Sequence, residues 1–160
     1  MKKGGSILEE YEKRLNNLLM DTFRDISKME ESVLQNEAIP LSICEVHLIE
    51  SVGDGLEKTR TVTEIAGDLG ITAASVTIGV NKLIRKGFLK KEKSTSDRRS
   101  VLISLTRDGE RVYRTHRLFH RRMVQSVFSG FSDEEKKALL LGLEKLDRFF
   151  QEKTAGEEAL

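Results

Sequence analysis

The side chains best suited to chemistry fall into two groups. The first is a run of small polar and long basic residues between positions 72 and 99, the types that contact nucleic-acid bases and phosphates. The second is the three histidines, His47, His116 and His120. His116 and His120 stand four residues apart, so on a helix they share one face, as paired metal ligands do. Whether these residues can bind nucleic acid or metal depends on the helices and strands that position them.

The pattern between residues 61 and 87 predicts two helices joined by a tight turn. Thr61 and the glutamate three residues later form a capping box that opens a short helix over residues 62–69. Gly70 stands in the usual C-terminal position of that helix. Thr72 then caps a second helix over about residues 73–86. The apolar stripe of this second helix consists of Val76, Val80, Leu83 and Ile84.

A predicted β-hairpin follows the second helix. Residues 88–93 and 101–105 are strand candidates, and residues 94–99 between them are too polar to be buried. In the second strand, Val101, Ile103 and Leu105 alternate with Leu102 and Ser104, as in a half-buried strand. Helix, turn, helix and hairpin in this order are typical of a winged helix-turn-helix, whose second helix lies in the DNA major groove.

The outward face of the second helix predicts contact with double-stranded DNA. Hydroxyl and amide side chains near its start can reach base edges, and methyl groups can meet a thymine methyl. The basic residues further along are better placed for phosphates, and a basic hairpin tip can lay an arginine in a minor groove. We predict as DNA contacts Thr72, Ala73, Ser75, Thr77, Ile78, Asn81, Lys82 and Arg85, with Arg98 and Arg99 of the hairpin, and expect Gly79 and Lys86 on the same outward side.

The distribution of charge supports this interpretation better than the net charge of +1. Lys and Arg are concentrated in residues 82–99 and 107–122, whereas residues 1–60 and 123–160 are both net acidic. One basic zone between acidic flanks is the electrostatic footprint of a phosphate-binding face. The alternative explanation is a solvated charged surface, which the adjoining motif makes less favoured.

Long helices are predicted at both ends of the chain, over residues 6–36 and 106–152. Apolar residues recur in both at steps of three and four, as in a coiled-coil seam. They are Leu8, Tyr11, Leu15 and Leu18 in the first, and Leu139, Leu143, Leu146 and Phe150 in the second. These regions either pair two copies of the chain or pack into an intramolecular two-helix core. Because twofold pairing doubles the base contacts, we expect a homodimer.

The sequence as a whole predicts one mainly α-helical chain, residues 1–160, with a small β-wing and a winged helix-turn-helix unit over residues 59–105. The single cysteine, Cys44, excludes an internal disulfide and fits a reducing compartment. No apolar run approaches the roughly 18 residues of a membrane span, so we expect a cytoplasmic protein. There is no Gly-rich phosphate loop and no nucleophile motif, so we expect no enzyme.

The hairpin and the residues after it resemble the MarR family of bacterial transcriptional regulators. The segment from Asp97 to Gly109 is similar to that family's wing signature, an Asp-x-Arg followed by Leu-Thr-x-x-Gly. The resemblance implies that Asp97 braces the wing arginines and that one of them enters the minor groove. It also implies a repressor that binds a pseudo-palindromic operator as a homodimer. Ile78 stands where many members of the family carry a basic residue, so the base preference of those members cannot be assigned to this chain.

Within the family, residues 41–47, 63–66 and 75–83 look most like the repressors of fatty-acid-synthesis genes. That branch implies lipid-synthesis target genes and a small-molecule or acyl-type effector. The three histidines also look similar to the ligands of the family's zinc-responsive repressors, which implies a zinc site completed by Glu30 or Glu31.

Three alternatives stay open at this stage. The histidines can instead be partly buried polar residues that hydrogen-bond together and need no metal. Cys44 can be a redox sensor, although its position differs from that of the family's sensing cysteine. A winged-helix protein can also serve as a protein-interaction module without DNA binding, although the basic wing argues against this.

Overall fold

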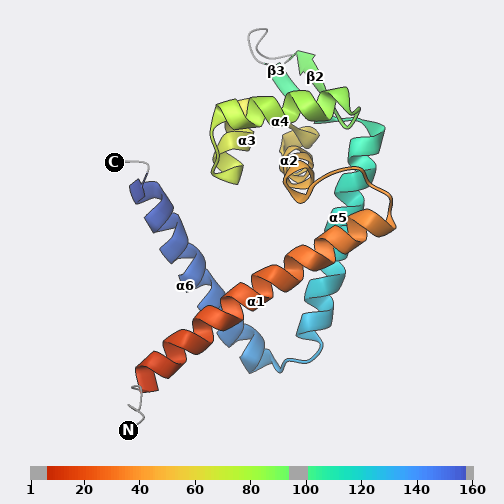
Figure 1. Ribbon diagram of the computed structural model, residues 1–160. Helices are drawn as coiled ribbons and strands as arrows, with labels where there is room; N and C mark the ends of the chain where they lie inside the picture. Colours follow the sequence, from red (N-terminus) through yellow and green to blue (C-terminus); the bar gives the residue numbers. More distant parts are fainter. Residues whose placement is uncertain (1–6, 94–100, 158–160) are drawn as a thin grey trace. The chain divides into compact units, whose positions relative to one another are not determined.

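The computed structural model describes residues 7–93 and 101–157, and the chain forms two compact units, Met1–Phe119 and His120–Leu160. The elements, labelled in Figure 1, are α1 (Ile7–Asn36), α2 (Ile43–Gly53), the 3-10 turn η1 (Leu56–Lys58), β1 (Thr59–Arg60), α3 (Val62–Leu69), α4 (Ala73–Arg85), β2 (Leu89–Lys93), β3 (Val101–Leu105), α5 (Arg107–Phe128) and α6 (Asp133–Glu157). The predicted mainly α-helical fold with a small β-wing is confirmed.

Capping side chains fix the starts of α2 and α3. The Ser42 N–H donates to Glu45 Oε2 at 2.9 Å, and the Thr61 N–H donates to Glu64 Oε2 at 2.7 Å. Each glutamate N–H in turn donates to the cap hydroxyl, which completes two capping boxes. Gly70 ends α3 with a φ of 62°, a left-handed conformation that glycine adopts without steric cost.

Helix α4 packs closely on α2 through a glycine. We expected Gly79 on the outward face, but it is half-buried, and a Cβ added there would lie 2.5 Å from Leu48 Cδ1. The expectation was wrong because Gly79 borders the buried stripe of Val76 and Val80. The missing side chain lets the two helix backbones approach each other.

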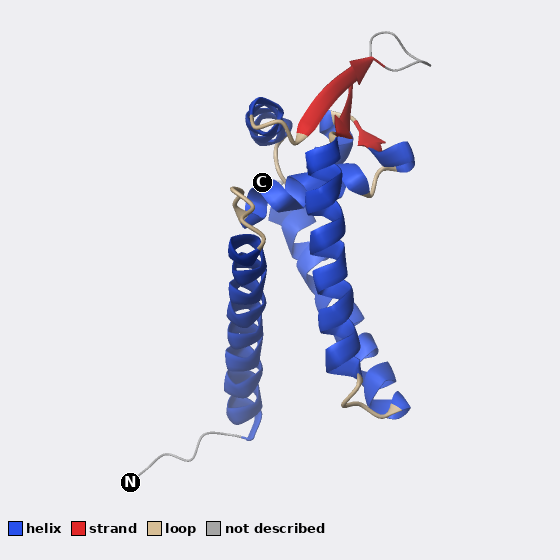
Figure 2. Cartoon of the chain, turned by 90° about the vertical axis from the view of Figure 1, so that its right-hand side faces the viewer, coloured by secondary structure: helices blue, strands red, loops and turns tan. Residues whose placement is uncertain are grey.

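The sheet has three antiparallel strands in the order β1-β3-β2. Figure 2 shows the strands in red, with β2 and β3 as the long pair. The sequence did not predict β1, whose Arg60 pairs with Ile103. The predicted alternation along β3 is also incomplete, because Ser104 is buried and Val101 is exposed. Ser104 lies between Thr59 and Lys90 of the flanking strands, whereas Val101 lies beyond the end of β1.

Helix α2 runs through the core of the first unit. Val46, Ile49 and Val52 are fully buried on it. The residues that surround them come from every neighbouring element and include Leu34, Ile65, Val76, Leu83, Ile103 and Val112. Full burial of one aliphatic side chain contributes about 1.5–3 kcal/mol, so the buried side chains of α2 are a substantial source of stability in this unit.

The Leu-Thr-x-x-Gly segment, residues 105–109, connects β3 to α5, and contacts at this junction explain its threonine and glycine. The Thr106 N–H donates to the Phe88 carbonyl at 3.0 Å, and Thr106 Oγ1 lies 2.6 Å from the Gly87 carbonyl oxygen. The same hydroxyl accepts the Gly109 N–H at 3.2 Å. A Cβ on Gly109 would lie 2.1 Å from the Phe88 carbonyl oxygen, so only glycine fits in this first turn of α5.

The second unit consists of the last part of α5 and of α6. A third capping box opens α6, with the Ser132 N–H donating to Glu135 Oε2 at 2.8 Å. The helix continues to Glu157, beyond the predicted end at residue 152. Among the described residues, no helix is long and apolar enough to cross a membrane.

We expect Gly109→Ala to destabilise the first unit. The new methyl group must displace a backbone carbonyl that already accepts a hydrogen bond, and overpacking of this kind costs about 1–3 kcal/mol. Urea unfolding at fixed protein concentration measures the loss.

Gly67→Ala is the matched control. Gly67 is an exposed residue of α3 with open space around its Cβ position. Alanine is favoured over glycine in a helix interior by about 0.5–1 kcal/mol, so this variant gains stability. A Gly109→Ala variant as stable as the parent would contradict the proposed close contact.

Candidate nucleic-acid interface

The predicted outward face of α4 is largely exposed. On the inner side, Val76, Val80 and Leu83 are at most 1% exposed, whereas Ile78 on the outer side is 71% exposed. The other exposed members of the predicted contact set are Thr72, Ala73, Ser75, Thr77, Lys82 and Arg85. This helix therefore presents small side chains at its start and basic ones near its end.

Several of these side chains also make contacts within the protein. Thr72 Oγ1 accepts the Ser75 N–H at 3.2 Å, and Thr77 Oγ1 donates to the Ala73 carbonyl at 2.8 Å. Asn81 is half-buried, and its Oδ1 accepts from Lys91 Nζ at 2.9 Å. The Asn81–Lys91 bond joins α4 to β2 and so fixes the helix relative to the wing.

The basic end of α4 meets a buried carboxylate. Glu45 Oε1 lies 3.1 Å from Lys82 Nζ and 2.8 Å from Lys86 Nζ. Burial raises the pKa of Glu45, but hydrogen bonds from Lys86, the Ser42 N–H and Lys82 outweigh it and lower the pKa to about 2. Lys86 Nζ also donates to the Pro40 carbonyl at 3.2 Å. Lys86 therefore anchors α4 to α2, which its sequence position did not reveal.

Three predicted contacts belong to the hairpin tip. Asp97, Arg98 and Arg99 lie outside the described residues. The strands that lead to the tip are described, and they pair from Leu89 with Leu105 to Lys93 with Val101. The roles of the three residues stay predictions.

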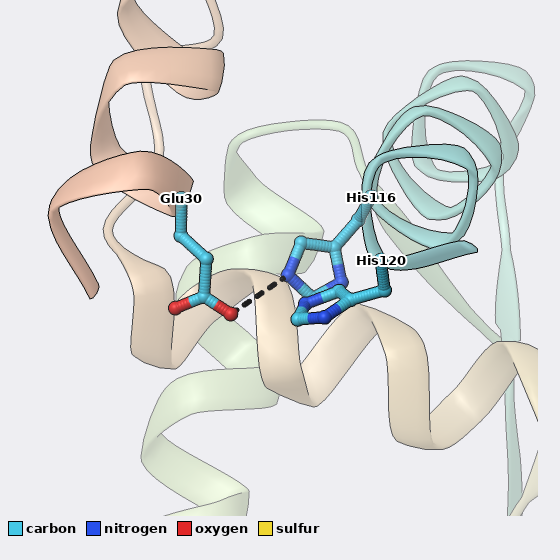
Figure 3. Close-up of side chains that lie close together, drawn as sticks. All are labelled: Glu30, His116 and His120. Carbon is cyan, nitrogen blue, oxygen red and sulfur yellow. Dashed lines mark ion pairs between the residues drawn. The ribbon is translucent and has the colours of Figure 1, made fainter. Parts of the chain in front are cut away.

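Two of the histidines meet two carboxylates between α1, α2 and α5. His116 is 3% exposed, and its Nε2 lies 3.6 Å from Glu30 Oε1. Figure 3 marks this ion pair with a dashed line. His116 Nδ1 lies 3.2 Å from Glu50 Oε2, and His47 Nε2 lies 3.9 Å from Glu30 Oε1. Of the two carboxylates expected from the first helix, Glu30 is buried at this site, whereas Glu31 is exposed.

His120, the third histidine, lies one turn beyond His116 on α5 and is the first residue of the second unit. The continuous helix places the two imidazoles on the same face, as their spacing predicted. The exposed Cys44 stands near the start of α2, apart from the ion pairs that join Glu30, His47, His116 and Glu50.

A recognition helix with a buried inner face, a tight turn closed by Gly70, and an antiparallel hairpin directly after it define a winged helix-turn-helix transcriptional regulator. The model of the MarR family matches residues 57–101.

Two curated relatives have names of the same class. The HTH-type transcriptional regulator PchR of Bacillus subtilis (strain 168) is 29% identical over 88% of this chain and 80% of its own length. The HTH-type transcriptional regulator BilQ of Clostridium symbiosum (strain WAL-14163) is 30% identical over 74% of this chain and 79% of its own length.

A solved structure, Streptococcus pneumoniae FabT in complex with DNA, is 32% identical with a TM-score of 0.81, over 88% of this chain and 97% of that one. The chain belongs to the MarR family. The predictions of family, fold class and regulatory function are confirmed at this level.

The lowered pKa of Glu45 predicts how the stability of the fold changes with pH. The ionised carboxylate stabilises the fold fully above about pH 5, and this stabilisation is lost as the pH falls toward about 2. We expect Glu45→Gln to lose about 2 kcal/mol of unfolding free energy at pH 7 and to decline less steeply between pH 5 and pH 2. Urea unfolding across this pH range provides the measurement.

Glu31→Gln serves as the control, because Glu31 is exposed and forms no ion pair within the described part of the chain. It should follow the parent curve throughout. Equal curves for the parent and Glu45→Gln would show that the Glu45 contacts contribute nothing to stability.

Proposed function

We propose that the chain acts as a homodimeric repressor that binds a pseudo-palindromic operator in double-stranded DNA. In this proposal α4 enters the major groove and the wing loop reaches the minor groove. The observation that carries the proposal is the division of α4 into a buried stripe and an exposed face of small polar and basic side chains. The DNA-bound state of the FabT relative supports the same use of the fold.

The proposed contacts divide by chemistry. Near the start of α4, the side chains are short enough to approach base edges, and Ile78 offers methyl groups to thymine. Lys82 and Arg85 contact phosphates, which position the helix but carry no sequence information. Asp97, Arg98 and Arg99 are proposed to form the wing contact. The base-reading set is Thr72, Ala73, Ser75, Thr77, Ile78 and Asn81.

The proposed dimer uses the terminal helices. On α1, the large apolar residues Ile7, Leu8, Tyr11, Leu15, Leu18 and Phe23 are each more than half exposed. On α6, Leu141, Phe149 and Phe150 are more than half exposed as well. Large apolar side chains exposed in this number along a helix are typical of a protein interface. A second copy of the chain that packs on each helix would bury them.

For the target genes, we propose lipid synthesis, with a small-molecule or acyl-type effector. The support is the resemblance of residues 41–47, 63–66 and 75–83 to the fatty-acid-synthesis repressors. An effector acts by preferring a spacing of the two recognition helices that the operator does not fit.

Selection of genomic DNA fragments by the purified protein tests this proposal. We expect recovered fragments to share a pseudo-palindrome and to lie upstream of lipid-synthesis genes. Binding should weaken with salt, with a slope of about −0.9 per phosphate contacted, and Arg85→Ala should reduce this slope by about one on every duplex. Lys137→Ala, which removes an exposed charge from α6, is the control with an unchanged slope.

An affinity that does not change with salt would exclude DNA binding and favour a protein-interaction module. Salt-dependent binding to fragments from other operons would support the proposed DNA-binding regulator and contradict only the proposed lipid-synthesis targets.

A second candidate is metal-dependent regulation through the histidine cluster. The observation that favours it is the buried Glu30 carboxylate beside His116 and His47 from two other helices, since Zn²⁺ accepts this combination of ligands. Glu30, His47, His116 and His120 would hold the ion. The competing possibility is that these groups hydrogen-bond together and only set the positions of the helices.

A metal assay of protein purified without chelator separates the two. The metal candidate expects about one zinc ion per chain in the parent and loss of it in His116→Ala. Cys44→Ala, at the exposed thiol outside the cluster, is the control and should keep the metal. Parent protein without metal, even after incubation with Zn²⁺, would end this candidate.

A further inference from the structure

A buried carboxylate lies behind the recognition helix and binds two of its lysines. Glu45 is 6% exposed and comes from the first turn of α2. Lys82 of α4 and Lys86, the C-cap residue of the same helix, are one turn apart, and both ammonium groups reach Glu45 Oε1. Lys82, which we propose contacts a phosphate, is thus already paired with an acidic group of the same protein.

The two lysines are held differently. The Lys86 side chain is 32% exposed and has the Pro40 carbonyl as a second acceptor. The Lys82 side chain is 54% exposed, and its one ion-pair partner among the described residues is Glu45. Lys86 alone neutralises the buried carboxylate. Lys82 can therefore leave Glu45 without leaving an unpaired buried charge, which would be strongly destabilising.

We propose that Glu45 is a specificity-determining residue that competes with DNA phosphate for Lys82. This inference rests on the proposed DNA contact of Lys82. When α4 is seated in its operator, a phosphate replaces Glu45 as the partner of Lys82. On other DNA, where the helix does not reach the same depth, Lys82 stays on Glu45 and contributes no counterion release. Glu45 thereby lowers non-specific affinity while Lys86 keeps α4 docked on α2.

Besides the lysine ion pairs with Glu45, an uncharged contact also holds α4 against α2. Leu48 lies one turn after Glu45 on α2 and fills the space beside Gly79 of α4. The same side of α4 carries Lys82 and Lys86 further along. Removal of the Glu45 charge leaves the Gly79–Leu48 contact in place, so α4 remains packed on α2 while Lys82 becomes available to any phosphate.

Glu45→Gln tests the proposal on a random-sequence duplex and on an operator fragment selected with the parent protein. We expect non-specific binding to strengthen and its salt slope to steepen by about 0.9. The advantage over the parent should therefore shrink about three- to fourfold between 50 and 200 mM salt. Operator binding should gain less, so the ratio of operator to random affinity falls.

Glu64→Gln is the matched control. Glu64 holds the same place in the capping box of α3 and carries the same charge, but it forms no ion pair with a lysine in the described residues. An equal gain in non-specific affinity from Glu64→Gln would show a general field effect and overturn the proposal.

Lys82→Gln gives a second test that does not depend on the stability of Glu45→Gln. In the parent background it should reduce the salt slope on the operator by about one and leave the slope on random duplex unchanged. Equal reductions on both duplexes would overturn the competition. Absence of binding to any duplex by the parent would instead refute the proposed function, so the two failures are distinguishable.

Discussion

The burial of α2 is the constraint on which the rest of the first unit depends. Three of its side chains, Val46, Ile49 and Val52, have no exposed surface, so the helix cannot move without opening the core. Burial also brings the Glu45 carboxylate out of water, and this charge must have cationic partners. The recognition helix supplies them through Lys82 and Lys86. Docking of α4 is therefore a consequence of how α2 is buried.

The same helix also contacts the histidine cluster. Glu45 and Leu48 of α2 contact α4, whereas His47 and Glu50 approach Glu30 of α1 and His116 of α5. A ligand that changes the cluster acts on a rigid element that also holds the recognition helix. The change in DNA affinity cannot exceed the ligand's differential affinity for the two arrangements. This adjacency is a physical route for coupling between the cluster and the recognition helix.

The sequence predicted the elements well where local chemistry determines them. Capping residues and glycines placed the starts and ends of α3 and α4, because these signals act within a few residues. It did not predict β1, since two residues are too few to show alternation. It also placed Gly79 outward, because a glycine carries no polarity that distinguishes the faces of a helix.

Contacts between residues far apart in the sequence were harder to predict than the helix ends. Glu45 and Lys86 are separated by 41 residues, and in the sequence Glu45 has the appearance of a capping residue alone. The approach of Glu30 to His116 was expected only from resemblance to the zinc-responsive branch, since no local pattern joins a first helix to a fifth. The wing contacts remain predictions, because Asp97, Arg98 and Arg99 lie outside the described residues.

The modest net charge of +1 is compatible with specific DNA binding for a physical reason. Non-specific affinity comes almost entirely from phosphate contacts, whereas base contacts distinguish one sequence from another. A recognition helix with small side chains and Ile78 on its exposed face gains discrimination without added charge. A carboxylate that withholds a lysine from unselected DNA increases discrimination further. Both features reduce background affinity, and twofold symmetry then doubles the base contacts at the correct site.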